Sequence, residues 1–207
     1  MDNITQKLKE HYVKKFDEHG ASSQGVDWGP QEKADIRYQV MMNVVHEADR
    51  EAGFSMLDVG CGYGGQLDFA KANGYTAQFT GIDVAPNMIE HANQNLPEGE
   101  WITTDLFGWD DNRQFDYVVC NGILTQKLST TTLEMEAFAS KLIASMWAKT
   151  RKGLVFNCMT THVDFKNDGN FYKNPLEMLA EALKYTHDVR LDHAYPLYEY
   201  AIYMYRD

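Results

Sequence analysis

The chain has 207 residues, of which 44% are hydrophobic, and this suits a single α/β domain with a core large enough to fold alone. Its formal net charge of −11 argues against a nucleic-acid partner, because nucleic-acid binders concentrate Lys and Arg on one face. No basic start leads into an apolar run, and no apolar run approaches the roughly 20 residues that span a bilayer. We therefore expect no membrane partner.

The spacing of the cysteines and an apolar stripe near the start of the chain give the first indications. Three cysteines, at positions 61, 120 and 158, lack the spacing of a metal site or a disulfide framework, which predicts a reducing, cytoplasmic location. Apolar residues recur at every fourth position near the start of the chain: Ile4, Leu8, Tyr12 and Phe16. This spacing predicts an amphipathic helix over residues 2–18 that packs its stripe on the core.

A second helix is predicted to begin at Gly29 and Pro30 and to reach about Glu51. Trp28 lies off the apolar stripe in a glycine-flanked loop between the two helices, which makes it a candidate contact for a ligand. We expect residues 1–52 to form a helical cap or lid.

From residue 53 onward, short apolar runs alternate with helical patterns. The predicted strands are residues 56–59, 79–84, 101–104, 117–120, 154–158, 188–194 and 199–205. Such alternation predicts a parallel sheet. The last two runs are separated by too few residues for a parallel crossover, so the final strand is expected to be antiparallel. The predicted fold is α/β: a seven-stranded, mostly parallel sheet over residues 53–207, with helices on both faces and the helical cap in front of it.

A glycine turn with a preceding carboxylate follows the first of these strands. Gly60, Gly62 and Gly65 satisfy the G-x-G-x-x-G spacing of dinucleotide-binding turns. The backbone N–H groups and the helix dipole of such a turn favour a negatively charged ligand. The Asp58 carboxylate would repel a pyrophosphate placed there. The same carboxylate attracts an amino group and a sulfonium, the cationic groups of S-adenosylmethionine.

The order of motifs resembles that of the class I S-adenosylmethionine-dependent methyltransferases, from about residue 55 to the C-terminus. Asp58-Val59-Gly60-Cys61-Gly62 is similar to the family's first motif, in which the glycines admit the methionine moiety and the acid helps to hold its amino group. Gly81-Ile82-Asp83-Val84 resembles the second motif, whose acid binds the ribose hydroxyls.

The resemblance continues along the next two strands. Asp105-Leu106 is similar to the third motif, in which an acid accepts a hydrogen bond from the adenine amino group, and Met88 and Leu106 are candidate walls for the ring. Residues 115–122 resemble the fourth strand, whose carboxyl end faces both cofactor and acceptor. With Trp28 included, the expected cofactor-binding residues are Trp28, Asp58, Gly60, Cys61, Gly62, Asp83, Val84, Met88, Asp105, Leu106, Asn121 and Gly122.

Two other charged residues are interpreted as lying away from any ligand. Asp116 stands at the start of the fourth strand, away from the end at which ligands bind. Arg37 could pair with the carboxylate of the cofactor, but an exposed position on the second helix is the favoured interpretation.

The reaction that the resemblance implies is an in-line displacement, in which the site aligns a nucleophile with the methyl group and excludes water. An alcohol acceptor also needs a base, whereas an amine need only arrive neutral. His162, just after the fifth strand, is the predicted base, with Tyr172 or Asp164 as its orienting partner. The alternative is that His162 is a surface-loop histidine.

The acceptor is inferred by elimination. After Asn121 the chain lacks the Pro-Pro-aromatic motif of amino-directed DNA methyltransferases, and no acidic cluster of the catechol type follows the fourth strand, so we expect neither nucleic acid nor metal. The predicted acceptor is a small polar metabolite, methylated on oxygen or nitrogen. Two alternatives stay open: a non-catalytic S-adenosylmethionine-binding protein and, less favoured, a nicotinamide-linked oxidoreductase. The sequence gives no indication of the oligomeric state.

Overall fold

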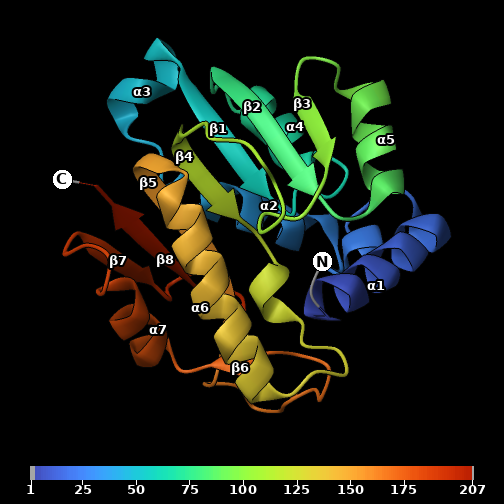
Figure 1. Ribbon diagram of the computed structural model, residues 1–207, viewed down its shortest axis with the longest axis vertical. Helices are drawn as coiled ribbons and strands as arrows, with labels where there is room; N and C mark the ends of the chain where they lie inside the picture. Colours follow the sequence, from blue (N-terminus) through green and yellow to red (C-terminus); the bar gives the residue numbers. More distant parts are fainter. Residues whose placement is uncertain (1–2, 207) are drawn as a thin grey trace.

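A twisted sheet runs through the computed structural model, which describes residues 3–206 (Figure 1). Within these residues its strands are β1 (Phe54–Val59), β2 (Ala77–Asp83), β3 (Glu100–Thr103), β4 (Phe115–Cys120), β5 (Thr150–Thr160), β6 (Tyr172–Lys173), β7 (Val189–Asp192) and β8 (Glu199–Tyr205). The order across the sheet is β3-β2-β1-β4-β5-β8-β7, with β6 paired to the end of β5. β8 runs antiparallel to both of its neighbours, β5 and β7, and the other strand pairs within the described residues are parallel. The predicted sheet with an antiparallel last strand is confirmed, and β6 is an additional short strand.

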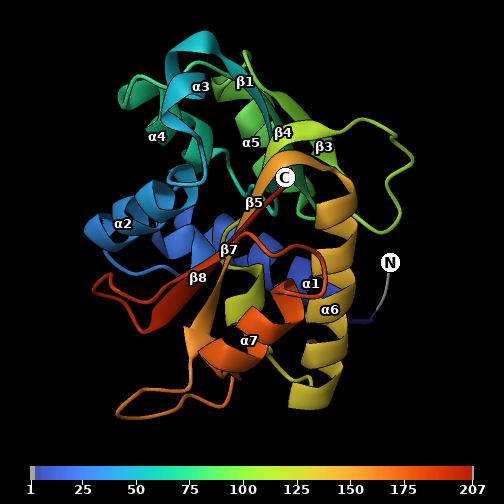
Figure 2. The same cartoon turned by 90° about the vertical axis from the view of Figure 1, so that its left-hand side faces the viewer.

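Helices cover both faces of this sheet. They are α1 (Asn3–His19), α2 (Gln31–Met42), α3 (Glu47–Ala52), α4 (Gly65–Ala72), α5 (Pro86–Asn95), α6 (Thr132–Ala148) and α7 (Pro175–Ala182), with the 3-10 turns η1 (Gln24–Val26) and η2 (Ile123–Thr125). One core cluster joins α6 and α7 to one face, and the other joins α2, α4 and α5 to the opposite face (Figures 1 and 2). Every helix within residues 3–206 is too short or too polar to traverse a bilayer.

The second predicted helix differs from the structure. It was expected to run to about Glu51, whereas α2 ends at Met42 and α3 begins at Glu47. The α-helical hydrogen-bond pattern ends here, because the N–H groups of Val44 and Val45 donate to the carbonyls three residues earlier, at 3.2 and 3.1 Å. The Tyr117 hydroxyl holds the turn by accepting a hydrogen bond from the His46 N–H at 3.1 Å.

The predicted division into a cap (residues 1–52) and a second unit (residues 53–207) stays a prediction. Residues 1, 2 and 207 of those ranges lie outside the described residues. In the described part, Leu8 of α1 and Met41 of α2 each belong to a core cluster shared with the sheet, so the cap packs directly on the rest of the chain.

Local capping fixes where α6 begins. Thr131 Oγ1 accepts from the Glu134 N–H at 3.2 Å, and the Glu134 carboxylate accepts from the Thr131 N–H at 2.9 Å. This reciprocal pair satisfies two donors that a helix start otherwise leaves open, as the sequence predicts. The helix so positioned carries Phe138 and Leu142 to the sheet.

We expect Thr131→Ala to lower the free energy of unfolding by about 1 kcal/mol, the usual effect of losing a side-chain cap. Thr132→Ala, at the exposed neighbouring position, is the matched control and is expected to change stability by less than about 0.5 kcal/mol. Denaturant unfolding of both variants checks this, and equal effects would contradict the role given to the cap.

Candidate functional site

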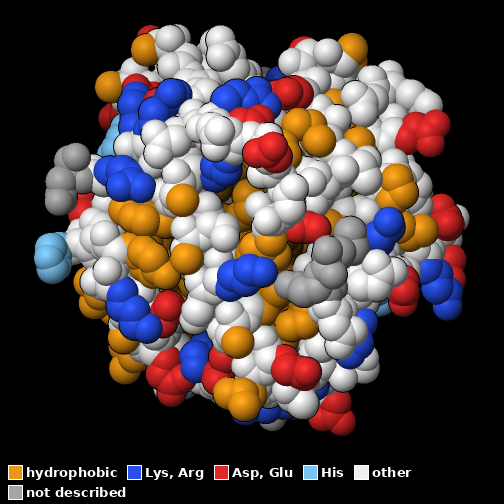
Figure 3. Space-filling model, in the orientation of Figure 1, with side chains coloured by type: hydrophobic (Ala, Val, Ile, Leu, Met, Phe, Trp, Pro, Cys, Tyr) orange, Lys and Arg blue, Asp and Glu red, His pale blue; other side chains and the backbone are white. Residues whose placement is uncertain are grey.

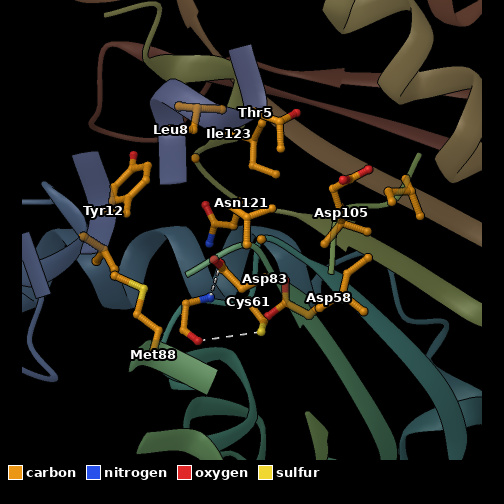
Figure 4. Close-up of a pocket in the computed structure, with 18 of the residues that line it drawn as sticks. Thr5, Leu8, Tyr12, Asp58, Cys61, Asp83, Met88, Asp105, Asn121 and Ile123 are labelled. Carbon is orange, nitrogen blue, oxygen red and sulfur yellow. Dashed lines mark hydrogen bonds between the residues drawn. The ribbon is translucent and has the colours of Figure 1, made fainter. Parts of the chain in front are cut away.

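A cavity of about 970 Å³, its open mouth included, lies at the carboxyl ends of β1, β2 and β4 (Figure 4). All twelve residues predicted to bind the cofactor line it. Thr5, Leu8 and Tyr12 of α1 stand across the cavity from the strand ends, as Figure 4 shows. From outside, hydrophobic side chains occupy hollows near the centre of the face that carries α6, with charged side chains around them (Figure 3). The cavity thus lies between the sheet and the N-terminal helix.

The glycine turn brings the backbone close to this space. Gly60 and Gly62 have φ values of +77° and +55°, which L-residues with side chains rarely adopt. A Cβ on Gly60 would stand 2.6 Å from Ile123 Cδ1, so a side chain there would displace Ile123 in addition to straining the backbone. A Cβ on Gly62 would instead project among the cavity-lining residues, 3.5 Å from Val26 and 3.7 Å from Met88. The turn therefore forms a cradle that a ligand can approach closely.

Asp58 is the most unusual electrostatic feature of the cavity. The residue is only 2% exposed, and its Oδ1 has no hydrogen-bond partner within residues 3–206. Burial, with a smaller contribution from the charge of Asp83, raises the pKa of the Asp58 carboxyl to about 8. A buried acid in this state is stabilised as an anion by a cation placed beside it. The ammonium group of the S-adenosylmethionine methionine moiety has that chemistry.

Asp83 is held in a fixed orientation by the backbone. Its carboxylate accepts from the Gly62 N–H at 2.9 Å and from the Ala85 N–H at 2.8 Å. Desolvation raises its pKa, and these backbone bonds partly offset that effect. Each oxygen keeps capacity for a further hydrogen bond. A pair of ribose hydroxyls fits such an oriented acceptor.

The far end of the cavity combines one acid with apolar walls. Asp105 accepts from the Gly108 N–H at 2.8 Å, which orients its side chain at the end of β3. Met88 and Leu106 are buried and line the same cavity. A cavity that offers apolar walls and a hydrogen-bond acceptor suits a flat ring that carries an amino group.

Several residues that line the cavity were not predicted from the sequence. Tyr12 was assigned to core packing from its spacing, yet it lines the cavity together with Thr5 and Leu8 of the same helix. A helical stripe indicates which side chains face inward, and it does not distinguish a core from a cavity. Gln66, in the first turn of α4, also lines the cavity and has a buried Oε1 without a partner in the described chain. Its place next to the glycine turn was the available signal.

The two predicted catalytic residues are not part of this lining. β5 continues to Thr160, so His162 follows in an exposed loop that extends beyond the sheet (Figure 2). Its ring centroid lies 6.1 Å from that of His193. The Tyr172 hydroxyl accepts from the Asn167 N–H at 3.0 Å, within the same loop region. This geometry favours the surface-loop alternative for His162, and a base role for His162 or Tyr172 has no support from its position.

The interpretation of Arg37 as an exposed arginine is wrong. Its side chain is 11% exposed and its Nε donates to both carboxylate oxygens of Glu199, at 3.0 and 3.2 Å. Glu199 also accepts from Asn157 Nδ2 at 2.8 Å, and Asn157 Oδ1 accepts from the Gly122 N–H at 2.8 Å. Arg37 Nη1 donates to the Trp28 carbonyl at 3.3 Å. A buried polar network therefore connects Trp28 to the loop after β4.

Asp116 agrees with its structural interpretation. At the start of β4 it accepts from the Ser55 N–H at 2.9 Å and from the Ser55 hydroxyl at 3.0 Å. Arg151 Nε lies 3.3 Å from its carboxylate. These contacts join β4 to β1 at the end of the sheet opposite to the cavity.

Similarity to known proteins identifies the family. A family model described as a methyltransferase domain matches residues 56–143. "Putative methyltransferase Rv1506c" of Mycobacterium tuberculosis is 34% identical over 164 residues, which cover 78% of this chain and 96% of that protein. The chain belongs to the S-adenosylmethionine-dependent methyltransferases. It is an enzyme of that class, and S-adenosylmethionine is its methyl donor.

Other similarities extend over different lengths of this methyltransferase. The trans-aconitate 2-methyltransferase of Azoarcus sp. is 25% identical over 91 residues, 44% of this chain and 36% of that enzyme. Magnesium protoporphyrin IX methyltransferase from Synechocystis PCC 6803, solved with bound SAM, superposes with a TM-score of 0.71 at 14% identity, covering 100% of this chain and 99% of its own. The DhpI-SAM-HEP complex gives 0.66 at 16% identity, covering 98% and 99%. The structural similarities show the shared Rossmann-like fold.

We expect Asp58→Asn to change how stability depends on pH. The folded pKa of about 8 lies above the unfolded value, so between about pH 4 and 8 the folded state keeps a proton that the unfolded state loses. Wild-type stability therefore falls relative to the variant as pH rises through this range, by up to about 1.4 kcal/mol per pH unit. Unfolding of the ligand-free proteins at pH 5, 6.5 and 8 measures this, and a difference independent of pH would contradict it.

Proposed function

We propose that this methyltransferase transfers a methyl group to oxygen or nitrogen of a small polar metabolite by in-line displacement. The observation that carries this proposal is that a single cavity between α1 and the strand ends is lined by more residues than the donor needs. Beside the twelve residues that we assign to the donor, the lining includes Tyr12 and Ile123, which we assign to the acceptor. The names of two similar proteins, which act on trans-aconitate and on magnesium protoporphyrin IX, agree with a small-molecule acceptor.

The proposed roles of the lining residues follow from their chemistry. Asp58 holds the amino group of the cofactor, Asp83 its ribose hydroxyls, and Asp105 its adenine amino group. Met88, Leu106 and Val84 pack against the adenine and ribose. The glycine turn at residues 60–62, with Cys61 in it, receives the methionine moiety. When bound, the cofactor supplies an electrophilic methyl group on a sulfonium.

The N-terminal cap is proposed to exclude water from the acceptor. Trp28 lines the cavity, and its ring packs edge-on against Tyr38 with centroids 5.3 Å apart. The backbone at Asn121 and Gly122 is proposed to face both cofactor and acceptor. Water exclusion matters because the displacement proceeds best when the nucleophile is desolvated and aligned. A cytoplasmic location is part of the proposal, since the three cysteines at 61, 120 and 158 are free and buried.

We expect Asp83→Asn to weaken binding of S-adenosylhomocysteine by about 10- to 100-fold, because hydrogen bonds to a charged acceptor contribute about 1.5–3 kcal/mol. Asp116→Asn is the matched control: it changes an acid at the opposite end of the sheet and is expected to lower stability without changing affinity. Calorimetric titration of both variants tests the assignment. Equal losses of affinity would contradict the ribose role of Asp83.

The acceptor class is tested with labelled S-adenosylmethionine and a metabolite extract separated by size. We expect the label to appear in a small product, on oxygen or nitrogen. Label confined to protein or nucleic acid would contradict the proposed acceptor, although binding of S-adenosylhomocysteine would still identify the donor site.

A further inference from the structure

Among the described residues that line the cavity, the ionisable side chains are acids or very weak acids. Among the described residues that line it, the carboxylates are Asp58, Asp83 and Asp105, and none is a lysine, arginine or histidine. Its tyrosines, Tyr12, Tyr38 and Tyr63, have hydroxyl pKa values raised by desolvation. The lining therefore offers no cation to an anionic acceptor. It also offers no side chain suited to take a proton from an alcohol at neutral pH, apart from acids assigned to the cofactor.

One neutral polar group in the cavity has no role within the protein. Asn121 directly follows β4 and is 7% exposed, yet neither Oδ1 nor Nδ2 has a hydrogen-bond partner within residues 3–206. Its amide points into the cavity toward the side on which Tyr12 lies (Figure 4). A buried amide without a partner in the protein is costly, and its position in the cavity allows a bound ligand to satisfy it.

The backbone that carries this amide is held in place. The Gly122 N–H donates to Asn157 Oδ1 at 2.8 Å, and Asn157 in turn donates to Glu199. Gly122 has a φ of +93°, and Trp28 Nε1 lies 3.1 Å from where a Cβ would stand. The Asn121 side chain is thus presented from a fixed loop, which suits a group that orients a nucleophile.

These observations distinguish the possible acceptors. A carboxylate is already nucleophilic, but its charge is repelled by the neighbouring acids. An alcohol, a phenol or a carbon acid needs a base. A neutral amine needs neither a base nor a cation, and its N–H groups can donate to an amide oxygen while its lone pair stays free.

We infer that the acceptor is the neutral amino group of a small molecule, held by the Asn121 amide oxygen. This inference rests on the proposed function and narrows it to nitrogen. The nitrogen lone pair forms the new C–N bond as the S–C bond breaks and its electron pair returns to sulfur. Positive charge moves from sulfur to nitrogen, and the resulting ammonium later releases its proton to water. The acidic cavity accommodates the charge at both positions, and the aromatic residues Tyr12 and Trp28 line the same cavity.

The first experiment uses matched acceptors on two skeletons, benzyl and cyclohexylmethyl, each as the amine, the alcohol and the carboxylate. Transfer of labelled methyl is measured, and binding to protein saturated with S-adenosylhomocysteine is measured separately by calorimetry. We expect label and binding with the amines alone. Label in an alcohol or a carboxylate would overturn the inference, as would failure of both amines to bind. A labelled small product from the metabolite extract that carries its methyl on oxygen would overturn it while leaving the proposed function intact.

The second experiment compares two asparagines with different surroundings. Asn121→Leu removes an amide with no internal partner, so we expect an unchanged or higher melting temperature and, in protein saturated with S-adenosylhomocysteine, amine binding about tenfold weaker. Asn157→Leu removes the partner of Gly122 and Glu199 and is expected to lower the melting temperature by several degrees.

Three results would contradict the role of Asn121. One is an equal loss of melting temperature in both leucine variants, which would make its amide structural. Another is unchanged amine binding in Asn121→Leu. The third is a loss of amine turnover in His162→Ala at unchanged S-adenosylhomocysteine affinity, because it would reveal a base that an amine acceptor does not need.

Discussion

The buried carboxyl of Asp58 is the constraint on which the site depends. It ends β1 beside a turn whose glycines allow close approach, and Asp83 ends the neighbouring strand. Two desolvated acids so close together disfavour the ionised state, and burial raises the pKa of Asp58 to about 8. A pyrophosphate would add to that repulsion, whereas a ligand with an ammonium group and a sulfonium relieves it. The same electrostatics explain the choice of methyl donor and support the proposal of an uncharged acceptor.

The antiparallel last strand also contributes to the site. Because β8 pairs with β5, Glu199 comes beside Asn157, whose amide holds the backbone at Gly122. Arg37 of α2 completes this network from the N-terminal cap and also binds the Trp28 carbonyl. Breaking a buried ion pair by removing one partner is strongly destabilising. A network of hydrogen bonds and an ion pair therefore joins the cap to the loop after β4. The cap forms part of the site.

The fold and the group of strand-end residues that line the cavity could be predicted because their signals are local: apolar runs, capping residues, and acids at strand ends in a fixed order. The remainder depends on contacts between distant residues. Arg37 and Glu199 are 162 positions apart, so no local pattern in the sequence indicates that they pair. Tyr12 shows that helical spacing marks an inward face without telling core from cavity. His162 does not line the cavity because β5 continues to Thr160, beyond the apolar run at residues 154–158, and the length of the strand decides where the next loop emerges.

The most direct test of the central claim is a titration of the Asp58 side chain by NMR of protein with ¹³C-labelled aspartate carboxyls, using Asp58→Asn for assignment. Without ligand, the carboxyl of Asp58 should titrate with a pKa of about 8. With S-adenosylhomocysteine bound, the amino group of the ligand should bring that pKa well below its ligand-free value. A pKa in the ordinary range for aspartate without ligand, or one that the ligand leaves unchanged, would contradict the role assigned to Asp58.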